Sequence, residues 1–371
     1  MNSKKILICC FEVPGWGGAS TSAYELFGNF YKDGYEVNFI NLISTLQEKY
    51  FKKLFTGNLG NPKHLPNVYN YFLTPPDYDY QEKLAEIINE INPDVILAVG
   101  WIAVIIMKKA SPEKKLIYLT TGSNQVKNYI QFKKLDSYLY LEKFIKKNNY
   151  RLAILSKEER EAVISADFVI THSEMMQDVY KYFYKSMQGK IFSETIWFAE
   201  WIYNDAINYK HFSRNFNERK FDVVFIASDW ARLEKNYILV KKLVKHLDHL
   251  NICVVGKVPE KIGTATYTGV LTDRNKLFEL LGNTKTIVCP SIFDSAPGIL
   301  FEASALECNI VTSKNCGNWQ ICNDALLVDP FEKKYFQQKI SLSLENKFED
   351  NVHYFLQSGS YKKLIEAVNL F

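Results

Sequence analysis

The sequence predicts an α/β protein made of two Rossmann-like, doubly wound domains that face a central cleft. Three observations predict this: the length of the chain, the alternation of short apolar runs with longer amphipathic stretches, and the restart of that alternation after about residue 220. A chain of 371 residues is long enough for two domains, and 47% hydrophobic residues supply a core for each. Ligands of open α/β sheets bind at the carboxyl ends of the strands, so we expect the functional site there.

The first domain is expected over residues 1–200. Its apolar runs are short and end at turn or polar residues, which is typical of strands in a parallel sheet. The expected strands are KILICCF (5–11), YEVNFINL (35–42), DVILAVG (94–100), KLIYLTT (115–121) and DFVITHS (167–173). The amphipathic stretch ASTSAYELFGNFYKDG (19–34) is expected to form the helix between the first two strands.

The second domain is expected over residues 201–350, with the polar segment 209–220 as the linker. Its expected strands are DVVFIAS (222–228), NICVVGK (251–257), TKTIVCPS (284–291), CNIVTSK (308–314) and ALLVDP (325–330). Its expected helices include EKNYILVKKLVKHLDHL (234–250) and NKLFELLGN (275–283). Residues 351–371 are expected to form a C-terminal helix, for which packing back on the first domain is one arrangement.

Composition excludes several function classes. A net charge of +4 is too weak to indicate a nucleic-acid partner. The seven cysteines are scattered without metal-ligand spacing, which favours a reduced, cytoplasmic protein. The longest apolar run, residues 95–107, is too short to span a bilayer, and the start of the chain lacks the features of a signal peptide. We therefore expect no transmembrane segment, while attachment to the inner face of a membrane stays open.

The first glycine-rich loop, PGWGGAS (14–20), follows the first expected strand and precedes the first helix. Glycine lets the backbone approach a ligand, and a helix N-terminus attracts anions. A dinucleotide fingerprint is incomplete, because Ser20 occupies its last glycine position and Asn38 lies near where an acid would bind ribose. A nicotinamide enzyme is weakly supported, and the loop is either a ligand loop or a tight turn.

The second motif is SDWARLEKN (228–236), directly after an expected strand. Arg232 and Lys235 are three residues apart, so they share a face of a first helical turn. A guanidinium and an ammonium at that position suit a diphosphate. The alternative is a solvated helix start, which the neighbouring Glu234 favours.

In the third motif, FDSAPGILFEA (293–303), Asp294 and Glu302 bracket a Pro-Gly turn. Pro297 is tolerated in the first turn of a helix, whose free amides would form a second anion site. Those amides belong to Gly298, Ile299 and Leu300. Glu302 lies about one turn further in among apolar residues, where a carboxylate needs a partner such as a ribose diol. The alternative, an acid that complements the helix dipole, is weaker beyond the first turn.

The second half of the chain resembles the C-terminal domain of retaining glycosyltransferases with the GT-B fold, the "glycosyl transferases group 1" family. The likeness extends over about residues 220–330 and includes the two cations, two strands that end in Gly256 and Gly269, the paired acids, and a glycine-bearing loop in CNIVTSKNCGN (308–318). The first 200 residues resemble the family loosely, through the Gly-Gly loop and DFVITHSEMMQDVY (167–180).

The resemblance implies a role for each motif. Arg232 and Lys235 would bind the donor diphosphate, and Asp294 would contact the donor sugar; these three are the candidate catalytic residues. Glu302 would hold the ribose hydroxyls, and Val270 would meet the nucleotide base together with its neighbour Leu271. The other implied donor contacts are Gly17, Gly18, Gly256, Pro297, Gly298 and Ile299.

The sequence departs from the family pattern in three places. Asp294 is one methylene shorter than the usual Glu, and Ser228 lies where a glycine is common. The histidine that many members carry in the first domain is not found, and DVILAVGWI offers Trp101 instead. The segment 119–125, LTTGSNQ, is the better candidate for the acceptor side.

The expected function is therefore that of a retaining, hexosyltransferase-type glycosyltransferase in polysaccharide or glycoconjugate biosynthesis. It would move a sugar from a nucleotide diphosphate sugar to a hydroxyl of a glycan, a lipid-linked acceptor or a small molecule. The resemblance implies no metal or other cofactor, and no dedicated protein base, since the departing phosphate takes the acceptor's proton. Two alternatives stay open: a nucleotide-sugar-binding protein that has lost catalysis, and a nucleotide-sugar epimerase of the same fold.

A basic, aromatic segment between residues 127 and 151 contains seven Lys or Arg and two acidic residues. It predicts either a peripheral surface for a lipid-linked acceptor and anionic membrane, or a solvated helix whose aromatic stripe faces the core. The oligomeric state is not predicted.

Overall fold

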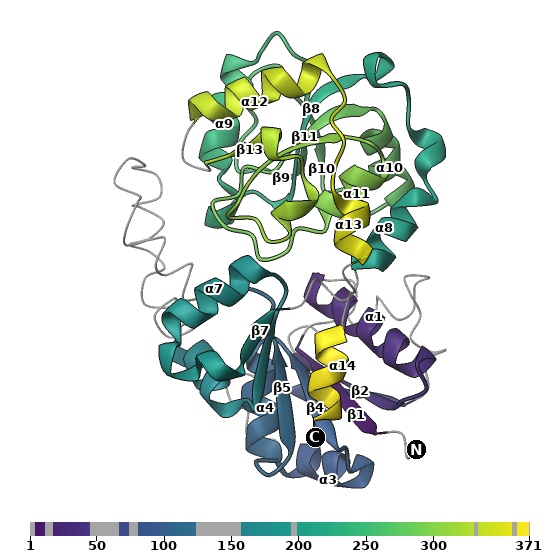
Figure 1. Cartoon of the computed structure of the whole chain (residues 1–371), viewed down its shortest axis with the longest axis vertical. Helices are drawn as coiled ribbons and strands as arrows, with labels where there is room; N and C mark the ends of the chain where they lie inside the picture. Colours follow the sequence, from purple (N-terminus) through teal and green to yellow (C-terminus); the bar gives the residue numbers. More distant parts are fainter. Residues whose placement is uncertain are drawn as a thin grey trace. The chain divides into compact units, whose positions relative to one another are not determined.

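The computed structural model describes residues 4–11, 18–44, 67–73, 81–123, 157–193, 199–329, 333–357 and 362–370 of the chain. The chain divides into two compact units, one comprising residues 1–198 with 361–371 and the other comprising residues 199–360. Each unit contains one parallel β-sheet with helices packed on it (Figure 1). The predicted α/β class and the restart of the pattern are therefore confirmed.

In the described part of the first unit, the sheet has seven strands in the order β3-β2-β1-β4-β5-β6-β7. The strands are β1 (Lys5–Cys10), β2 (Glu36–Ser44), β3 (Val68–Leu73), β4 (Val95–Val99), β5 (Lys115–Leu119), β6 (Phe168–Thr171) and β7 (Ile191–Ser193). β4 is buried along its whole length, which explains its uninterrupted apolar sequence. The sequence pattern did not reveal β3 and β7, because an asparagine interrupts the first and the second has only three residues.

The helices of the first unit cover its sheet with apolar faces. They include α1 (Gly18–Lys32), α3 (Gln81–Ile91), α4 (Trp101–Ala110), α7 (Glu174–Phe183) and α14 (Lys362–Asn369). On α1 the side chains of Ala23, Phe27 and Phe30 are fully buried, and their spacing of three or four residues puts them on one face. No helix within the described ranges is long and apolar enough to cross a membrane.

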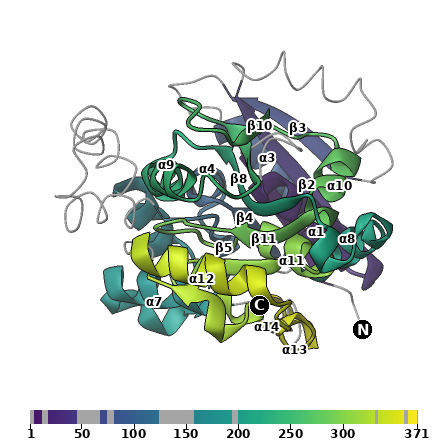
Figure 2. The ribbon, with the colours of Figure 1, turned by 90° about the horizontal axis from the view of Figure 1, so that it is seen from above.

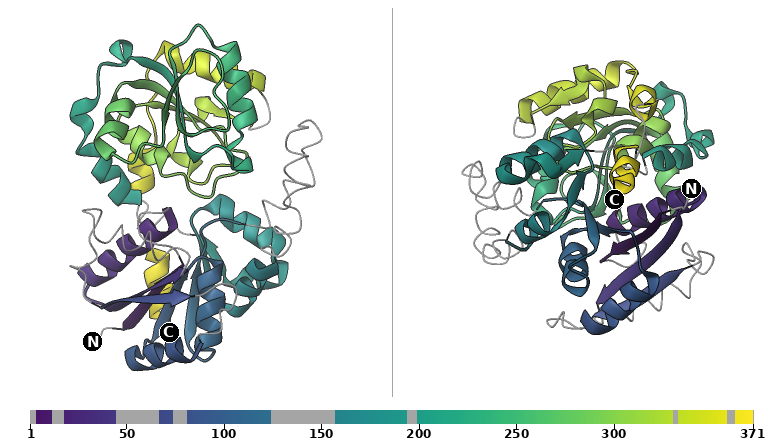
Figure 3. Two further views of the ribbon diagram at one scale, coloured as in Figure 1. Left: turned by 180° about the vertical axis from the view of Figure 1, so that it is seen from behind. Right: turned by 60° about the horizontal axis from the view of Figure 1, so that its bottom comes forward.

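The last helix, α14, belongs to the first unit although it ends the chain (Figure 3). Leu364 and Val368 bury its apolar face. The Lys4 ammonium donates hydrogen bonds to the carbonyl oxygens of Val368 and Asn369, at 3.2 and 3.1 Å. A cation at the C-terminus of a helix satisfies its unpaired carbonyls and complements the dipole.

The described residues of the second unit form a six-stranded parallel sheet in the order β10-β9-β8-β11-β12-β13. The strands are β8 (Phe221–Asp229), β9 (Ile252–Lys257), β10 (Thr266–Gly269), β11 (Thr284–Val288), β12 (Asn309–Ser313) and β13 (Leu327–Val328). Because β8 precedes the others in sequence but lies between β9 and β11, the strand order reverses at the β8–β11 pair. Open α/β sheets bind ligands at the carboxyl ends of strands at such a reversal.

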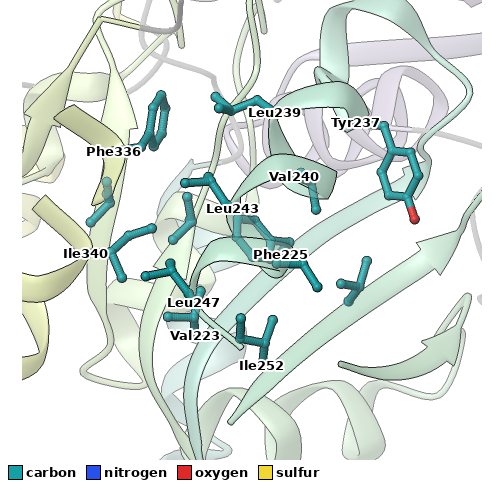
Figure 4. Packing of buried hydrophobic residues seen from close by; sticks show 14 of the residues in the cluster. Val223, Phe225, Tyr237, Leu239, Val240, Leu243, Leu247, Ile252, Phe336 and Ile340 are labelled. Carbon is teal, nitrogen blue, oxygen red and sulfur yellow. The ribbon is translucent and has the colours of Figure 1, made fainter. Parts of the chain in front are cut away.

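Helices cover both faces of this sheet (Figure 2). They are α8 (Ala199–Ile207), α9 (Tyr237–His246), α10 (Arg274–Gly282), α11 (Ile299–Ala305), α12 (Lys333–Glu345) and α13 (Val352–Gln357). α9 and α12 enclose a core with β8 and β9, in which Phe225, Leu243, Ile252 and Phe336 are buried (Figure 4). This core fixes the strand whose carboxyl end bears the two candidate cations.

The predicted linker, residues 209–220, is instead part of the second unit. It forms two short 3-10 turns, Lys210–Phe212 and Phe216–Glu218. The buried Arg219 guanidinium donates to the carbonyl oxygens of Thr284 and Glu307, at 2.8 and 2.9 Å. The polar composition of the segment concealed this role, because its arginine bonds to backbone oxygens inside the unit rather than to solvent.

Candidate functional site

The candidate site of the second unit lies where β8 and β11 end side by side. The loop after β8 carries Arg232 and Lys235, and the loop after β11 carries Asp294. Parallel pairing joins these strands directly, with Val224 opposite Ile287. Both loops therefore start from the same edge of the sheet, at the reversal of strand order.

An irregularity at the end of β8 shapes the first loop. The pairing of β8 with β9 shifts register between Ile226 and Asp229. Gly256 makes the shift sterically allowed: its φ is +114°, and a Cβ there would lie 1.6 Å from the Ala227 carbonyl oxygen. The structure thus gives Gly256 a backbone role, in addition to the donor contact that the resemblance implies.

Trp230 anchors the loop after the irregularity. Its indole is buried and donates a 2.8 Å hydrogen bond to the Val255 carbonyl, while its backbone N–H donates to the Lys257 carbonyl at 2.9 Å. The chain then turns through a 3-10 helix at Leu233–Lys235 into α9. The two cations are therefore presented from a loop that is held at its start by the sheet.

Lys235 and Asp294 form an ion pair across the two loops. Only 15% of the lysine side chain and 14% of the aspartate side chain are exposed. Burial opposes the charged form of Lys235, but attraction to Asp294 more than offsets it, so the pKa of the lysine is raised. The sequence-predicted cation and acid are thus neighbours, although 59 positions separate them in the chain.

Arg232 belongs to the same cluster. Its guanidinium bonds to the Glu234 carboxylate through Nε at 2.9 Å and Nη2 at 2.6 Å. Burial disfavours the arginine's charge, yet the carboxylates of Glu234 and Asp294 keep its pKa raised. In the sequence, Glu234 favoured a solvated helix start; the structure instead buries it beneath Arg232, whose side chain is still 47% exposed. A half-exposed guanidinium supported by a buried acid is available to an anionic ligand.

Hydrogen bonds to backbone carbonyl oxygens hold the two loops together. The Ile292 N–H donates to the Glu234 carbonyl at 2.8 Å. The Asn236 side-chain amide donates to the Pro290 carbonyl at 3.0 Å. Asn236 adopts a left-handed conformation with φ of 59°, which asparagine tolerates better than most residues. These contacts make the Lys235–Asp294 pair part of a fixed framework.

A third loop, after β12, supports Asp294. The Asp294 N–H donates to the Asn315 carbonyl at 3.1 Å, and the Gly317 N–H donates to the Asp294 carbonyl at 2.8 Å. The Asn315 side-chain amide also donates to the Ile292 carbonyl at 3.0 Å. The backbone groups of Asp294 are therefore occupied, and its carboxylate is the group left to act on Lys235 or a ligand.

The helix after Asp294 is shorter than the sequence indicated. α11 begins at Ile299, with Gly298 as its N-cap, and Pro297 is buried just before it. The Leu300 N–H donates to the Pro297 carbonyl at 3.2 Å. The prediction that this amide faces an anion is therefore wrong, because a tight turn already uses it. Gly298 and Ile299 are partly exposed at the start of the helix.

Glu302 has a protein partner that sequence reasoning missed. Its carboxylate lies 3.8 Å from Nη2 of Arg274, the first residue of α10, and Arg274 also pairs with Asp205 of α8. Burial raises the pKa of Glu302, Arg274 lowers it and Asp205 raises it, with a raised pKa as the result. Nothing in the local sequence indicated Arg274, because the pairing joins residues from three helices.

The remaining predicted donor contacts lie on other elements or outside the described residues. Val270 follows β10 and is 52% exposed, and Leu271 beside it is half-buried. Gly18 begins α1 in the first unit, whereas Gly17 and the basic segment 127–151 lie outside the described residues. Of the segment predicted to line the acceptor side, residues 119–123 are described.

Metal ligation has no support in the described ranges. There, no group of three or more His, Cys, Asp or Glu side chains is arranged to hold a metal ion. One Asp-x-Asp triplet, residues 77–79, lies in a segment that the structure does not describe. The charges that the structure brings together are the cations of Arg232 and Lys235 and the acids beside them.

Comparison with solved structures identifies the same architecture in a galactosyltransferase, in a glucosyltransferase and in a protein solved with UDP-glucose. A lipopolysaccharide outer core galactosyltransferase, WaaB, aligns with a TM-score of 0.61 at 12% identity, over 92% of this chain and 90% of that one. Anabaena HepE in complex with UDP-glucose aligns with a TM-score of 0.58 at 15% identity, over 96% and 100%. An α-glucosyltransferase in complex with UDP and DNA aligns with a TM-score of 0.54 at 11% identity, over the full length of both chains.

These likenesses confirm the predicted GT-B fold, two parallel α/β sheets of the kind seen in those structures. No protein-family model matches the sequence, and the comparison with curated proteins found no match. At such low identities the likeness concerns the fold alone.

Proposed function

We propose that this protein is a retaining glycosyltransferase that moves a sugar from a nucleoside diphosphate sugar to an acceptor hydroxyl. The observation that carries the proposal is the convergence of Arg232, Lys235 and Asp294 at the reversal of strand order in the second sheet. Two cations and one acid at that position suit a ligand with a diphosphate beside a hydroxyl-rich group. The fold shared with WaaB and HepE supports the same interpretation.

The proposed chemistry depends on charge that grows on the leaving group. As the bond to the sugar breaks, negative charge accumulates on the departing diphosphate. Lys235 would contribute a largely buried ammonium, and Arg232 a half-exposed guanidinium whose fork matches phosphate oxygens. Asp294, which pairs with Lys235 in the free protein, would accept a hydrogen bond from the donor sugar once the diphosphate takes over the lysine.

Glu302 and the loop after β10 would hold the nucleoside. A carboxylate accepts two hydrogen bonds from a ribose diol, and Val270 and Leu271 present an exposed and a half-buried apolar side chain for a base. HepE and the α-glucosyltransferase were solved with UDP-glucose and with UDP. A uridine donor is therefore the first candidate here.

Retention of the sugar's anomeric configuration and the fate of the acceptor's proton follow from the resemblance to the glycosyltransferase family. We propose that the departing phosphate takes the acceptor's proton, so that neither a metal nor a dedicated protein base is required. The acceptor would be a glycan or a lipid-linked molecule. The cysteines, which are buried and form no disulfide, fit a reducing cytoplasm, with the membrane's inner face as the place where a lipid-linked acceptor would be met.

The test is incubation of the purified protein with UDP-, GDP- and ADP-sugars, with and without candidate acceptors and with EDTA. We expect binding of one donor, release of its nucleotide and transfer that survives the chelator, with the product's anomeric configuration read by NMR. Binding without hydrolysis or transfer would indicate a nucleotide-sugar-binding protein. Conversion of the donor without an acceptor would indicate an epimerase. Absence of binding to every nucleoside diphosphate would reject the proposal.

A further inference from the structure

Arg274 has an unusual set of neighbours for the first residue of a helix. Its guanidinium pairs with Asp205 and reaches to 3.8 Å from Glu302. It also lies over two aromatic rings, 5.8 Å from the centroid of Trp201 and 4.8 Å from that of Phe278. These rings and the acid hold a flexible side chain in one place, so its position beside Glu302 is built into the fold.

Glu302 has few other charged neighbours. Its side chain is 15% exposed, on a helix whose adjoining residues Phe301 and Ala303 are buried. Among the described residues, the charged groups that act on it are Arg274 from α10 and Asp205 from α8. β12 and the 3-10 turn at Trp319–Ile321 also pack against α11. Neither contains an ionisable side chain that acts on Glu302. Arg274 is therefore the cation that this acid depends on.

We infer that Arg274 is a positioning residue for nucleoside recognition, which keeps the Glu302 carboxylate ionised and aimed so that it can accept hydrogen bonds from a ribose diol. The inference rests on the proposed function, because it assigns a role within the proposed donor site. Arg274 itself acts through Glu302 and does not contact the nucleotide.

The physical reason is that two acids, Glu302 and Asp205, share the positive charge of Arg274. Burial and Asp205 both raise the pKa of Glu302, while Arg274 lowers it. A protonated carboxyl has one oxygen that donates rather than accepts, so it pairs poorly with two hydroxyl donors. Without Arg274, Glu302 would hold its proton to higher pH and lose the ion pair that orients it.

The experiment compares four variants with the wild type by calorimetric titration. The ligands are UDP and 2′,3′-dideoxy-UDP, whose affinity ratio isolates the contribution of the ribose diol. The variants are Arg274→Ala, Arg274→Lys, Glu302→Gln and Lys276→Ala. Lys276 is an exposed cation two residues along the same helix and serves as the matched control.

We expect wild type and Lys276→Ala to prefer UDP over the dideoxy form by about ten- to a hundredfold, the range for hydrogen bonds to a charged group. Glu302→Gln and Arg274→Ala should both reduce this ratio toward one, and Arg274→Lys should recover part of it. For Arg274→Ala the ratio should increase again as the pH rises, because Glu302 then ionises without its partner.

An Arg274→Ala protein that keeps the wild-type ratio would overturn the inference, whether or not its affinity for both ligands falls. If Arg274→Ala keeps the wild-type ratio but Glu302→Gln reduces it, the proposed function stays intact. A wild-type protein that binds neither UDP nor GDP, ADP or CDP would instead reject the proposed function itself. If GDP, ADP or CDP binds tightest, its own dideoxy form replaces dideoxy-UDP.

Discussion

Lys235 of the loop after β8 and Asp294 of the loop after β11 form a largely buried ion pair at the point where the strand order of the second sheet reverses. The pair neutralises both groups in the free protein. A diphosphate bound as proposed would have to compete with Asp294 for the lysine. This competition would make the two residues separable by mutation, because one would serve the phosphates while the other restrains the lysine.

Lys235→Met should weaken binding of the matching nucleoside diphosphate by about ten- to a hundredfold, because the diphosphate loses a charge-assisted hydrogen bond. Transfer should fall by about 100- to 1,000-fold, the usual cost of removing one donor that stabilises leaving-group charge. Isothermal titration and initial rates would measure both. Lys241→Ala removes a lysine of α9 that pairs with Glu260, and it should change neither the affinity nor the transfer rate. Wild-type affinity in Lys235→Met would refute the diphosphate assignment.

Asp294→Asn should not weaken binding of the free nucleoside diphosphate, but it should lower turnover as Lys235→Met does. The substitution releases Lys235 from its partner, so affinity for the free nucleoside diphosphate should stay the same or increase. Sugar transfer should decrease by at least tenfold, because the acid proposed to contact the donor sugar is lost. Titration with the nucleoside diphosphate and with the intact donor, beside rate measurements, separates the two. A parallel loss of affinity for both ligands would show that Asp294 supports the loop rather than the sugar.

The fold could be predicted from the sequence because a strand of a parallel sheet is buried on both faces. Such a strand must therefore be a short apolar run. The runs at 222–228, 251–257 and 284–291 became β8, β9 and β11, and no end shifted by more than three residues. Arg232, Lys235 and Asp294 could also be placed together, because strand ends of adjacent parallel strands meet at one edge.

The sequence could not show which side chains of different helices pair with one another. Arg274 and Glu302 are 28 positions apart, and Asp205 precedes both on a different helix. Arg219 was similarly hidden in a polar segment, although it donates to buried carbonyl oxygens. Periodicity reports which face of a helix is buried, but it carries no information about which polar side chain of another helix meets it.

Gly256→Ala should destabilise the second unit by about 3 kcal/mol or more and displace the loop that carries the cations. The position has a φ of +114°, and the added Cβ would overlap the Ala227 carbonyl oxygen. Gly269→Ala is the matched control, since Gly269 ends the neighbouring strand with φ of +73° but a Cβ there meets nothing within 4 Å. It should cost only about 1–2 kcal/mol. Urea unfolding would measure both; equal costs would show that backbone conformation, not the close approach to β8, requires the glycine.

Glu302→Gln should change how the stability of the ligand-free protein depends on pH. The folded protein raises the pKa of Glu302 above its ordinary 4.5, so the folded state binds more protons than the unfolded state in the window just above that value. Wild-type stability therefore contains a contribution that is present below about pH 4.5 and is lost as pH rises through the folded-state pKa. The glutamine variant lacks it, so the variant's free energy of unfolding minus that of the wild type should increase with pH.

A control of opposite sign lies five residues along the chain. A hydrogen bond from Lys210 lowers the pKa of Glu307, so its contribution is present above the ordinary value and is lost as pH falls. For Glu307→Gln the same difference should therefore decrease with rising pH. Urea unfolding at intervals from about pH 3 to pH 7.5 measures both slopes. Parallel slopes in the two variants would mean that Glu302 is not held above its ordinary pKa. In that case the two acids around Arg274 would not be short of positive charge, and the dependence of ribose recognition on that arginine would lose its physical basis.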